Sequence, residues 1–273
     1  MSHFGRGLRH ALWRLFQRAG YNVASIAKQQ DEAARLAREK WRWVETLDIG
    51  TLVDVGANTG QFAWHFRSLR PDCLVYSFEP LEDCFHELQR EMAGVPGFAA
   101  FNVALGDSEG EVDFYRSEFS PSSSPLSMGQ AHKGLFPFTS EITFEKVTLR
   151  KLDSFAHSIM IRGGLLIKID VQGAEAQVLR GGPRLLNRAD AVIAEVGYLA
   201  LYDGQATIGD IFSALAEHGL TFMGFVDQYV RPGDSLPVYG DVLFLRPGSL
   251  RQVVAARQAD RPPLANACKR CMP

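Results

Sequence analysis

The sequence predicts an α/β fold in which helices cover both faces of a mostly parallel sheet. From residue 50 onward, short apolar runs alternate with segments of helical periodicity, a pattern typical of parallel strands joined by right-handed helical crossovers. The first apolar run, residues 51–55, leads directly into a glycine-rich turn and a helix. Residues 165–180 repeat this order of strand, turn and helix. Both segments are built like the ligand-binding turns of doubly wound domains.

Residues 1–49 predict a helical extension ahead of this domain. Leu8, Leu12 and Leu15 recur at helical spacing among arginines, and a second helix is expected over residues 25–47. A basic amphipathic helix can lie on a membrane surface. It can also pack on the main domain or on a second subunit of a homodimer, and we favour packing against protein.

The main domain is predicted over residues 50–250. Its strands are expected at residues 51–55, 74–78, 98–103, 165–169 and 191–196, and its helices at residues 61–69, 81–92, 174–180 and 208–218. Strands near residues 220–225 and 242–245 close the domain. The remaining residues, 251–273, are expected to form a peripheral tail.

Residues 105–150 interrupt the alternation with an insertion. Two strands are expected in it, at residues 112–115 and 142–149, and the segment between them, 117–140, is rich in Ser, Pro and Gly without periodicity. A loop of this length in a compact domain is usually a lid, a binding loop or a mobile segment. His132 could reach a bound acceptor if the loop closed as a lid, although most loop histidines are merely solvated.

Composition and charge exclude several classes of protein. Hydrophobic residues make up 46% of the 273 residues and the net charge is −2, so the chain is globular and nothing favours nucleic acid as a partner. No signal peptide or membrane span is recognised, which makes the cytoplasm the expected location. Cys73 and Cys84 are expected to be buried free thiols, and the lone C-x-x-C at residues 268–271 offers too few ligands for zinc.

Residues 53–61, VDVGANTGQ, carry the strongest functional signal. Gly56 and Gly60 allow a sharp turn that brings a ligand against the backbone N–H groups at the start of a helix. A pyrophosphate-binding turn would read G-x-G-x-x-G, whereas Asn58 stands between the glycines here. Asp54 would repel a pyrophosphate but attract the cationic ammonium or sulfonium group of S-adenosylmethionine. The pattern D-x-G-x-N-x-G therefore favours that methyl donor.

Further polar residues follow the next two predicted strands. Glu79 ends the second strand, where a carboxylate can accept hydrogen bonds from both ribose hydroxyls of an adenosine. This would suit NAD equally well, and the alternative is an exposed carboxylate before Pro80. Asn102 or Asp107, after the third strand, could bond the exocyclic amine of adenine.

Residues 168–175, KIDVQGAE, supply the third group of candidates. Asp170 ends a strand at the sheet edge where α/β domains bind ligands, and Glu175 either caps the next helix or acts on the substrate. Glu195 is expected at the end of the adjacent strand. Asp170 and Glu195 are therefore the candidates for the base that takes a proton from an acceptor hydroxyl. A variant that we do not favour places a divalent cation between them, and we assign no metal ligands.

Six segments, in this order and spacing, resemble the FkbM-type family of S-adenosylmethionine-dependent methyltransferases: VDVGANTGQF, FEP, NVALGD, TLRKLDSF, LIKIDVQGAEAQVLRGG and AEVGY. The resemblance covers about residues 50–246, and Gln172 departs from the glutamate usual in the family. It implies a Rossmann-like, seven-stranded class I methyltransferase fold and, typically, O-methylation of a hydroxyl on a sugar, glycolipid or natural product. The residues then expected to bind the donor are Asp54, Gly56, Asn58, Gly60, Glu79, Asn102, Asp107 and Asp170.

Two other functions stay open at this point. A nucleotide-linked oxidoreductase would share the fold, but the sequence lacks its middle glycine and any Tyr-x-x-x-Lys pair. A non-catalytic binding module could also keep the methyltransferase fold. The intact Asp54, Gly56, Gly60 and Glu79 argue against decay of the donor site, though not against loss of the acceptor site.

Overall fold

The computed structural model describes residues 39–249 of the 273-residue chain. The chain divides into two compact units, Met1–Arg42 and Trp43–Pro273. Residues 39–46 are helical, within the helix expected over residues 25–47. The basic helix predicted near the N-terminus, the C-terminal tail and the C-x-x-C motif lie outside the described residues. Within the described range, no helix is long and apolar enough to span a membrane.

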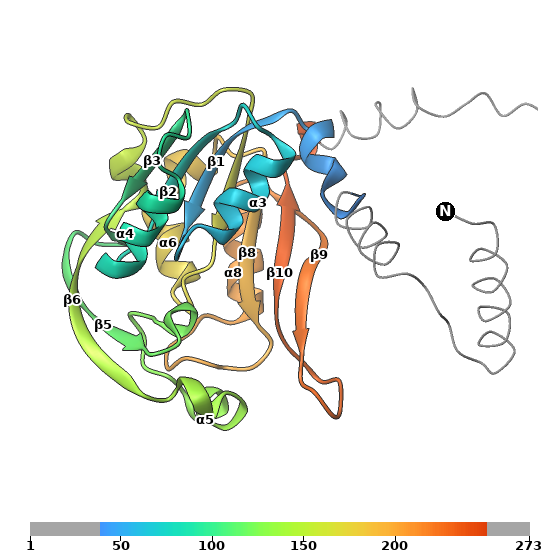
Figure 1. Cartoon of the computed structure of the whole chain (residues 1–273). Helices are drawn as coiled ribbons and strands as arrows, with labels where there is room; N and C mark the ends of the chain where they lie inside the picture. The colour runs from blue at the N-terminus through green and yellow to red at the C-terminus, as the bar shows by residue number, and fades with distance from the viewer. Residues whose placement is uncertain (1–38, 250–273) are drawn as a thin grey trace, which may run out of the picture. The chain divides into compact units, whose positions relative to one another are not determined.

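A seven-stranded sheet lies at the centre of the second unit, as the family resemblance implied (Figure 1). Its strand order is β3-β2-β1-β7-β8-β10-β9, and β10 runs antiparallel to both of its neighbours while the other pairs are parallel. All seven residues of β1 are buried, because a strand covered by helices on both faces must be apolar throughout. The strands are β1 (Ile49–Val55), β2 (Leu74–Phe78), β3 (Phe98–Phe101), β7 (Gly164–Ile169), β8 (Ala191–Gly197), β9 (Thr221–Val230) and β10 (Pro237–Leu245).

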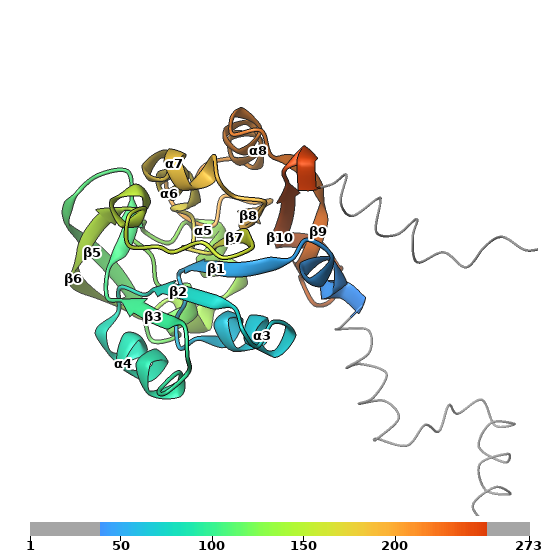
Figure 2. The same ribbon diagram turned by 90° about the horizontal axis from the view of Figure 1, so that it is seen from above.

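Helices cover both faces of this sheet, which confirms the predicted doubly wound arrangement (Figure 2). On one face lie α3 (Gln61–Leu69) and α4 (Glu82–Glu91). On the other face lie α6 (Glu175–Gly181), α7 (Pro183–Leu186) and α8 (Ile208–Glu217). The helices that connect β1, β2 and β3 thus lie on one face, and those that follow β7 and β8 lie on the other, as a doubly wound sheet requires.

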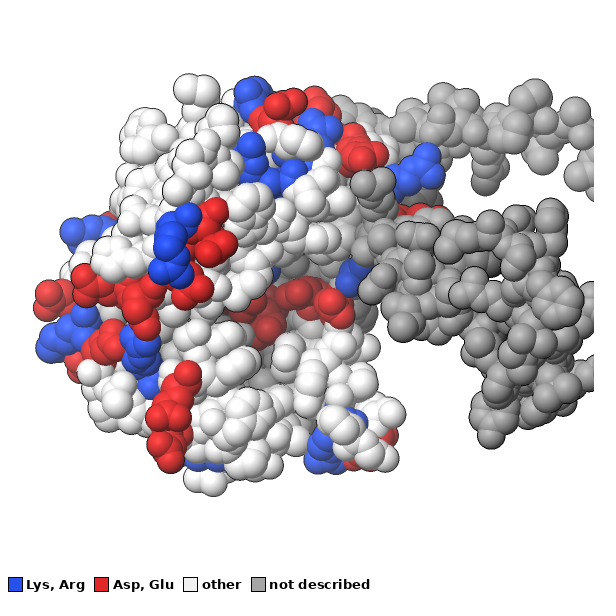
Figure 3. Space-filling model, in the orientation of Figure 1, with Lys and Arg blue, Asp and Glu red and all other residues white. Residues whose placement is uncertain are grey.

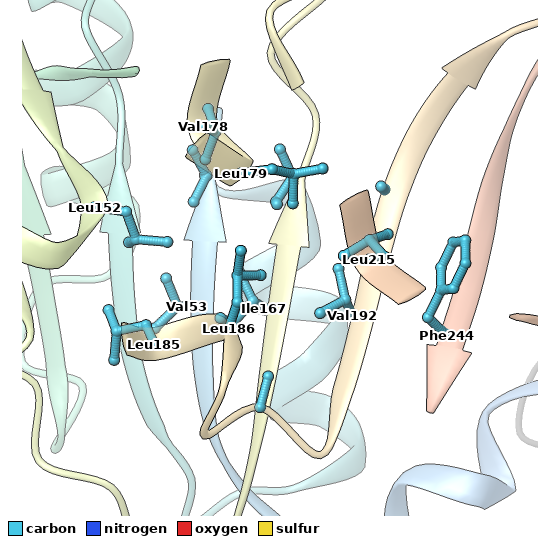
Figure 4. Packing of buried hydrophobic residues seen from close by; sticks show 14 of the residues in the cluster. Val53, Leu152, Ile167, Val178, Leu179, Leu185, Leu186, Val192, Leu215 and Phe244 are labelled. Carbon is cyan, nitrogen blue, oxygen red and sulfur yellow. The ribbon is translucent and has the colours of Figure 1, made fainter. Parts of the chain in front are cut away.

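The main hydrophobic core lies between the sheet and the helices α6, α7 and α8 (Figure 4). Val53 of β1 and Ile167 of β7 are completely buried, and so are Val178 of α6, Leu186 of α7 and Leu215 of α8. Burying one such side chain contributes about 1.5–3 kcal/mol. This packing fixes the central strands and therefore the turns at their carboxyl ends.

The insertion forms a second sheet of three strands in the order β4-β6-β5. Here β6 (Ile142–Lys151) pairs parallel with β4 (Ala104–Gly106) and antiparallel with β5 (Gly110–Ser117). The strand predicted over residues 98–103 ends two residues earlier, because Asn102 leaves the ladder and its side-chain amide donates to the carbonyl oxygens of Glu79 and Pro80.

The segment between β5 and β6 holds short helices where the sequence predicted an irregular loop. These are the 3₁₀ turns Ser120–Ser122 and Pro137–Thr139 and the helix α5 (Gln130–Leu135). Met128 of this segment forms an isolated bridge with Tyr202, and both side chains are buried in a small core of their own. The insertion therefore packs onto the chain that follows β8.

The register of the parallel strands aligns the residues that follow them. Val55 of β1 pairs with Phe78 of β2 and with Ile169 of β7, and Ile169 pairs with Ala194 of β8. The order of strands reverses between β1 and β7, which is the point where doubly wound folds bind ligands. The residues one step further along the four strands are Gly56, Glu79, Asp170 and Glu195.

Candidate active site

The turn after β1 approaches the end of β7 so closely that only glycine fits at position 56. Gly56 has φ 81°, and a Cβ on it would lie 1.8 Å from the backbone oxygen of Asp170. Gly60 has φ 94°, and a Cβ on it would lie 2.7 Å from the Leu88 side chain. Asn58 also has a positive φ, of 47°, and its side-chain oxygen accepts a hydrogen bond from the Thr59 N–H at 2.9 Å. The turn is therefore held in one conformation with its backbone facing the sheet edge.

Glu79 joins this turn to the end of β2. Its carboxylate accepts hydrogen bonds from the backbone N–H groups of Asn58 at 2.8 Å and Leu81 at 2.9 Å. The side chain is only 4% exposed. Burial raises the pKa of the Glu79 carboxyl to about 7, although the two N–H groups oppose the shift. The carboxylate predicted from the sequence as solvent-exposed or ribose-binding is thus buried at the sheet edge.

Asp54 is completely buried beside the same turn. Neither of its carboxylate oxygens has a hydrogen-bond partner among residues 39–249. Burial raises the pKa of this carboxyl to about 6, against the opposing effect of the Lys168 ammonium. A buried carboxylate without donors is unfavourable, so the fold places an unsatisfied acceptor next to Gly56.

Lys168 and Asp170 form an ion pair at the end of β7. The Lys168 ammonium donates to the Asp170 carboxylate over 2.8 Å, and it lies 5.2 Å from the centre of the Phe62 ring. Burial alone would lower the pKa of Lys168, but Asp170, Asp54 and Asp241 raise it above its usual value. For Asp170, burial acts upward, but the ammonium of Lys168 holds the pKa of the carboxyl below its usual range.

Gln172 bridges the two carboxylates that the sequence proposed for catalysis. Its side-chain NH2 group donates to Asp170 and to Glu195, at 2.9 Å in each case. Burial, followed by repulsion from Asp170, Glu175 and Asp241, raises the pKa of Glu195 well above its ordinary value. Two neighbouring carboxyl groups therefore have pKa values displaced in opposite directions, a pattern typical of acid and base pairs in active sites.

Glu175 stabilises the turn between β7 and α6. Its carboxylate accepts hydrogen bonds from the N–H groups of Val171 and Gly173, each at 3.1 Å. The side chain is 3% exposed, and burial raises its pKa to about 7. Of the two roles left open by the sequence, these contacts are those of a carboxylate that closes a turn at a helix N-terminus.

Several of these residues line a cavity of about 260 Å³ at the carboxyl ends of β1, β2 and β7. In the space-filling view, acidic side chains gather in a recess near the middle of the molecule's face (Figure 3). An excess of carboxylates favours a cationic ligand over an anionic one. The residues that line the cavity include apolar side chains such as Leu81, Leu105 and Phe114, and also Gly56, Asn58, Glu79, Lys168, Asp170 and Gln172.

The insertion supplies one wall of this cavity. Ser120, Pro121 and Ser123 line it, and Ser120 accepts a hydrogen bond from the Asn58 side chain at 3.1 Å. His132, in contrast, is 3% exposed within the insertion's own core, where its Nε2 lies 3.0 Å from the Thr139 hydroxyl. The expectation that His132 could reach an acceptor from a lid is therefore not met by its position.

Not every predicted residue lies at the cavity. The side-chain amide of Asn102 donates hydrogen bonds to the carbonyl oxygens of Glu79 and Pro80. Asp107 forms an ion pair with Arg180 of α6 at 2.8 Å. Neither lines the cavity, and neither do Asp54, Gly60 and Glu195, which were also predicted for the site. Within residues 39–249, no group of three or more His, Cys, Asp or Glu side chains is arranged to hold a metal ion.

The sequence predicted no role for two residues that belong to the site, Lys168 and Gln172. Lys168 is a lysine inside the apolar strand GLLIKI, and a lysine is rarely buried unless it is paired, so the sequence contained a signal for it. For Gln172, the sequence shows only a departure from the glutamate usual in the family. Its position between two carboxylates depends on the turn that follows β7 and could not be seen from spacing alone.

The fold and the cavity at its switch point define a class I S-adenosylmethionine-dependent methyltransferase. The strand order with an antiparallel β10, the glycine-rich turn after β1, Asp54 near the end of β1 and Glu79 after β2 all belong to that class. The chain matches the methyltransferase FkbM domain over residues 54–222 and belongs to this family. The resemblance found in the sequence is thereby confirmed.

Relatives with assigned names are methyltransferases. The chain is 26% identical to the 2-O-methyltransferase NoeI of Sinorhizobium fredii over 88% of this chain and 96% of that protein. It is 29% identical to Methyltransferase 1 of Beauveria bassiana over 49% of this chain and 59% of that protein. It is 27% identical to the hexuronic acid methyltransferase AglP of Haloferax volcanii over 64% of this chain and 65% of that protein.

Proposed function

We propose that this enzyme transfers the methyl group of S-adenosylmethionine to a hydroxyl group of a sugar or a related small-molecule acceptor. The observation that carries the proposal is the cavity at the carboxyl ends of β1, β2 and β7: Glu79 and Asp170 line it, and Gln172 of its wall donates a hydrogen bond to Glu195 of β8. The names of two relatives support a sugar-type acceptor: a 2-O-methyltransferase and a hexuronic acid methyltransferase.

The residues around the turn fit the methyl donor. Glu79 uses two acceptor sites for backbone N–H groups, and because a carboxylate offers about four, two remain for the ribose hydroxyls. Asp54 lacks a donor among the described residues and would be satisfied by the cationic end of the ligand. A Cβ at Gly56 would collide with the backbone oxygen of Asp170, so the turn can come this close to the end of β7 only with glycine at this position. Leu81, Leu105 and Phe114 would contact the adenine ring.

S-adenosylmethionine supplies a methyl group that is already activated by its sulfonium. The enzyme then has to orient the acceptor, exclude water and remove one proton. We assign proton removal to Glu195, since its raised pKa makes it the stronger base of the pair. Asp170, held ionised by Lys168, would orient the acceptor hydroxyl.

We also propose boundaries and surroundings for the enzyme. Residues 50–250 form the methyltransferase domain, preceded by the extension 1–49 and followed by the tail 251–273. The reaction is proposed to take place in the cytoplasm. A homodimer, and a membrane contact through the basic N-terminal helix, remain predictions because that helix lies outside the described residues.

Calorimetry combined with a transfer assay tests this function. The protein should bind S-adenosylmethionine and S-adenosylhomocysteine with micromolar affinity and should not bind NAD. With a panel of free and glycosidic sugars, it should transfer a radiolabelled methyl group to a hydroxyl. Glu195→Gln should lower kcat by about 10²–10⁴-fold while the donor affinity changes less than threefold. Binding of NAD alone, or equal turnover by the Glu195→Gln variant, would contradict the proposal.

A further inference from the structure

Gln172 occupies an unusual place, since a single amide nitrogen lies between two carboxylates. The NH2 group has two hydrogens, and it donates one to Asp170 and one to Glu195, each over 2.9 Å. Both carboxylates therefore use the same donor. Without that donor, two negative groups this close would repel each other in a partly buried site.

The orientation of the amide is fixed from its other end. The Tyr202 hydroxyl donates to Oε1 of Gln172 over 2.8 Å, so the oxygen faces the tyrosine and the nitrogen faces the carboxylates. The reverse orientation would put an amide oxygen against two carboxylates, which is electrostatically unfavourable.

The backbone around Gln172 is held equally firmly. Its φ of 55° is in the left-handed region, which a residue other than glycine adopts at a cost of roughly 1–2 kcal/mol. Its carbonyl oxygen accepts a hydrogen bond from the Ser124 hydroxyl of the insertion at 2.7 Å. A Cβ on the next residue, Gly173, would lie 2.9 Å from Tyr202. Strained backbone that several contacts hold in place is typical of functional positions.

A divalent cation is the usual alternative means of holding two carboxylates together. Such an ion is bound by oxygen ligands at about 2.0–2.6 Å, whereas the place between Asp170 and Glu195 is filled by a nitrogen of the protein. A glutamate at position 172 would replace this donor with a third carboxylate facing the same two.

We propose that Gln172 is a positioning residue which holds Asp170 and Glu195 in their working arrangement and takes the place of a bridging divalent cation. Tyr202 serves this role by orienting the amide. The inference rests on the proposed function, because it concerns the pair of residues assigned there to the acceptor hydroxyl. It also accounts for the departure from the family's glutamate as a change in how the pair is held.

The variant Gln172→Glu tests this inference without an acceptor. Binding of Mn²⁺, followed by electron paramagnetic resonance, should be at least tenfold tighter to Gln172→Glu than to the unaltered protein. The gain should disappear in the double variant Gln172→Glu, Glu195→Gln. Equal Mn²⁺ affinity of the unaltered protein and the Gln172→Glu variant would overturn the inference, and so would a gain that persists in the double variant.

Turnover provides the second readout. The unaltered enzyme should keep its rate in EDTA, whereas Gln172→Glu should lose at least tenfold in kcat and recover with Mg²⁺ or Mn²⁺. Gln172→Met removes the donor without adding a carboxylate, so it should lower kcat by a larger factor than it changes the KM for S-adenosylmethionine, and it should not gain Mn²⁺ affinity. Unchanged kcat in Gln172→Met, with an unchanged melting temperature, would also overturn the inference.

The two failures can be told apart. If the proposed function is wrong, the unaltered protein will not methylate any sugar, yet Mn²⁺ binding to Gln172→Glu can still be measured. If only the inference is wrong, sugar methylation will proceed while the Mn²⁺ affinities of the two proteins stay equal.

Discussion

The backbone N–H of Asn58 donates to the carboxylate of Glu79 over 2.8 Å, and this hydrogen bond joins the glycine-rich turn after β1 to the residue that follows β2. The same carboxylate accepts from Leu81 at 2.9 Å. Glu79 is therefore both a structural acceptor and, by its remaining lone pairs, the proposed partner of the ribose. The donor site and the local fold depend on one side chain.

Glu79→Gln is expected to weaken S-adenosylhomocysteine binding by about 10–100-fold. Glutamine keeps one acceptor oxygen, and its NH2 group would face one of the two backbone N–H donors. Calorimetric titration measures the change. Glu82→Gln is the matched control, since Glu82 lies on the exposed side of α4 with 81% of its side chain accessible, and it should leave the affinity unchanged. An unaltered affinity in Glu79→Gln would show that this residue does not contact the donor.

Gly56→Ala should destabilise the protein by at least about 3 kcal/mol and abolish donor binding. The added Cβ would lie 1.8 Å from the Asp170 backbone oxygen, so β1 and β7 would have to separate at the cavity. Urea denaturation gives the change in unfolding free energy.

Gly94→Ala is the control for this substitution. Gly94 has a similar φ of 74°, but a Cβ added there would meet no other atom within 4 Å. Only the left-handed backbone is then penalised, by about 1–2 kcal/mol. Equal losses at the two positions would mean that backbone conformation, and not the contact with Asp170, makes glycine necessary at position 56.

Much of this site could be predicted because it follows from the order of strands. Gly56, Glu79, Asp170 and Glu195 each come at the end of an apolar run, and parallel strands bring such ends to one edge. The contacts that depend on side-chain direction were not predictable in this way. Asn102 and Asp107 also follow a strand, but they turn toward Glu79, Pro80 and Arg180 instead of the cavity.

The insertion shows a second limit of sequence patterns. Its Ser- and Pro-rich composition indicates a loop, yet the segment packs around Tyr202 and places Ser120 and Ser123 in the cavity wall. These are contacts between distant parts of the chain, such as Ser124 with Gln172. Local periodicity carries no information about them.

Stability without ligand should fall as the pH rises from about 5 to 8. The pKa values of Asp54, Glu79 and Glu175 are raised to about 6, 7 and 7, so the folded state keeps protons that the unfolded state has released. Their stabilisation is complete below pH 4 and is lost as the pH passes the folded pKa values. His132, whose pKa is lowered by burial, acts in the opposite sense, but it is one group against these three and Glu195, whose pKa is also raised by burial.

The unfolding free energy should be lower at pH 8 than at pH 5.5 by at least about 1.4 kcal/mol, the equivalent of one pKa unit in one group. Asp54→Asn, which cannot ionise, should make the protein more stable at pH 8 while weakening donor binding. Urea denaturation at both pH values measures this difference. A stability that rises with pH, or an Asp54→Asn variant that is less stable at pH 8, would contradict the assignment of Asp54 as a buried, unsatisfied carboxylate.

Lys168→Met should cost about 3 kcal/mol of unfolding free energy, because it leaves Asp170 without its cation and removes the charge that opposes Asp54. Adding Asp170→Asn should restore at least about 1 kcal/mol, since the second change removes the unpaired carboxylate. Both changes are measured by urea denaturation, and donor affinity is followed by calorimetry.

The surface provides a matched control for this ion pair. Lys146 and Asp113 are also 2.8 Å apart, but each side chain is 67% exposed, whereas Lys168 is only 7% exposed. Exposed pairs contribute about 0–1 kcal/mol, so Lys146→Met should change the stability by less than that. If Lys146→Met and Lys168→Met had equal effects, burial would not be what makes the Lys168–Asp170 pair important. A double variant no more stable than Lys168→Met would show that Asp170 does not need Lys168 as its counter-charge.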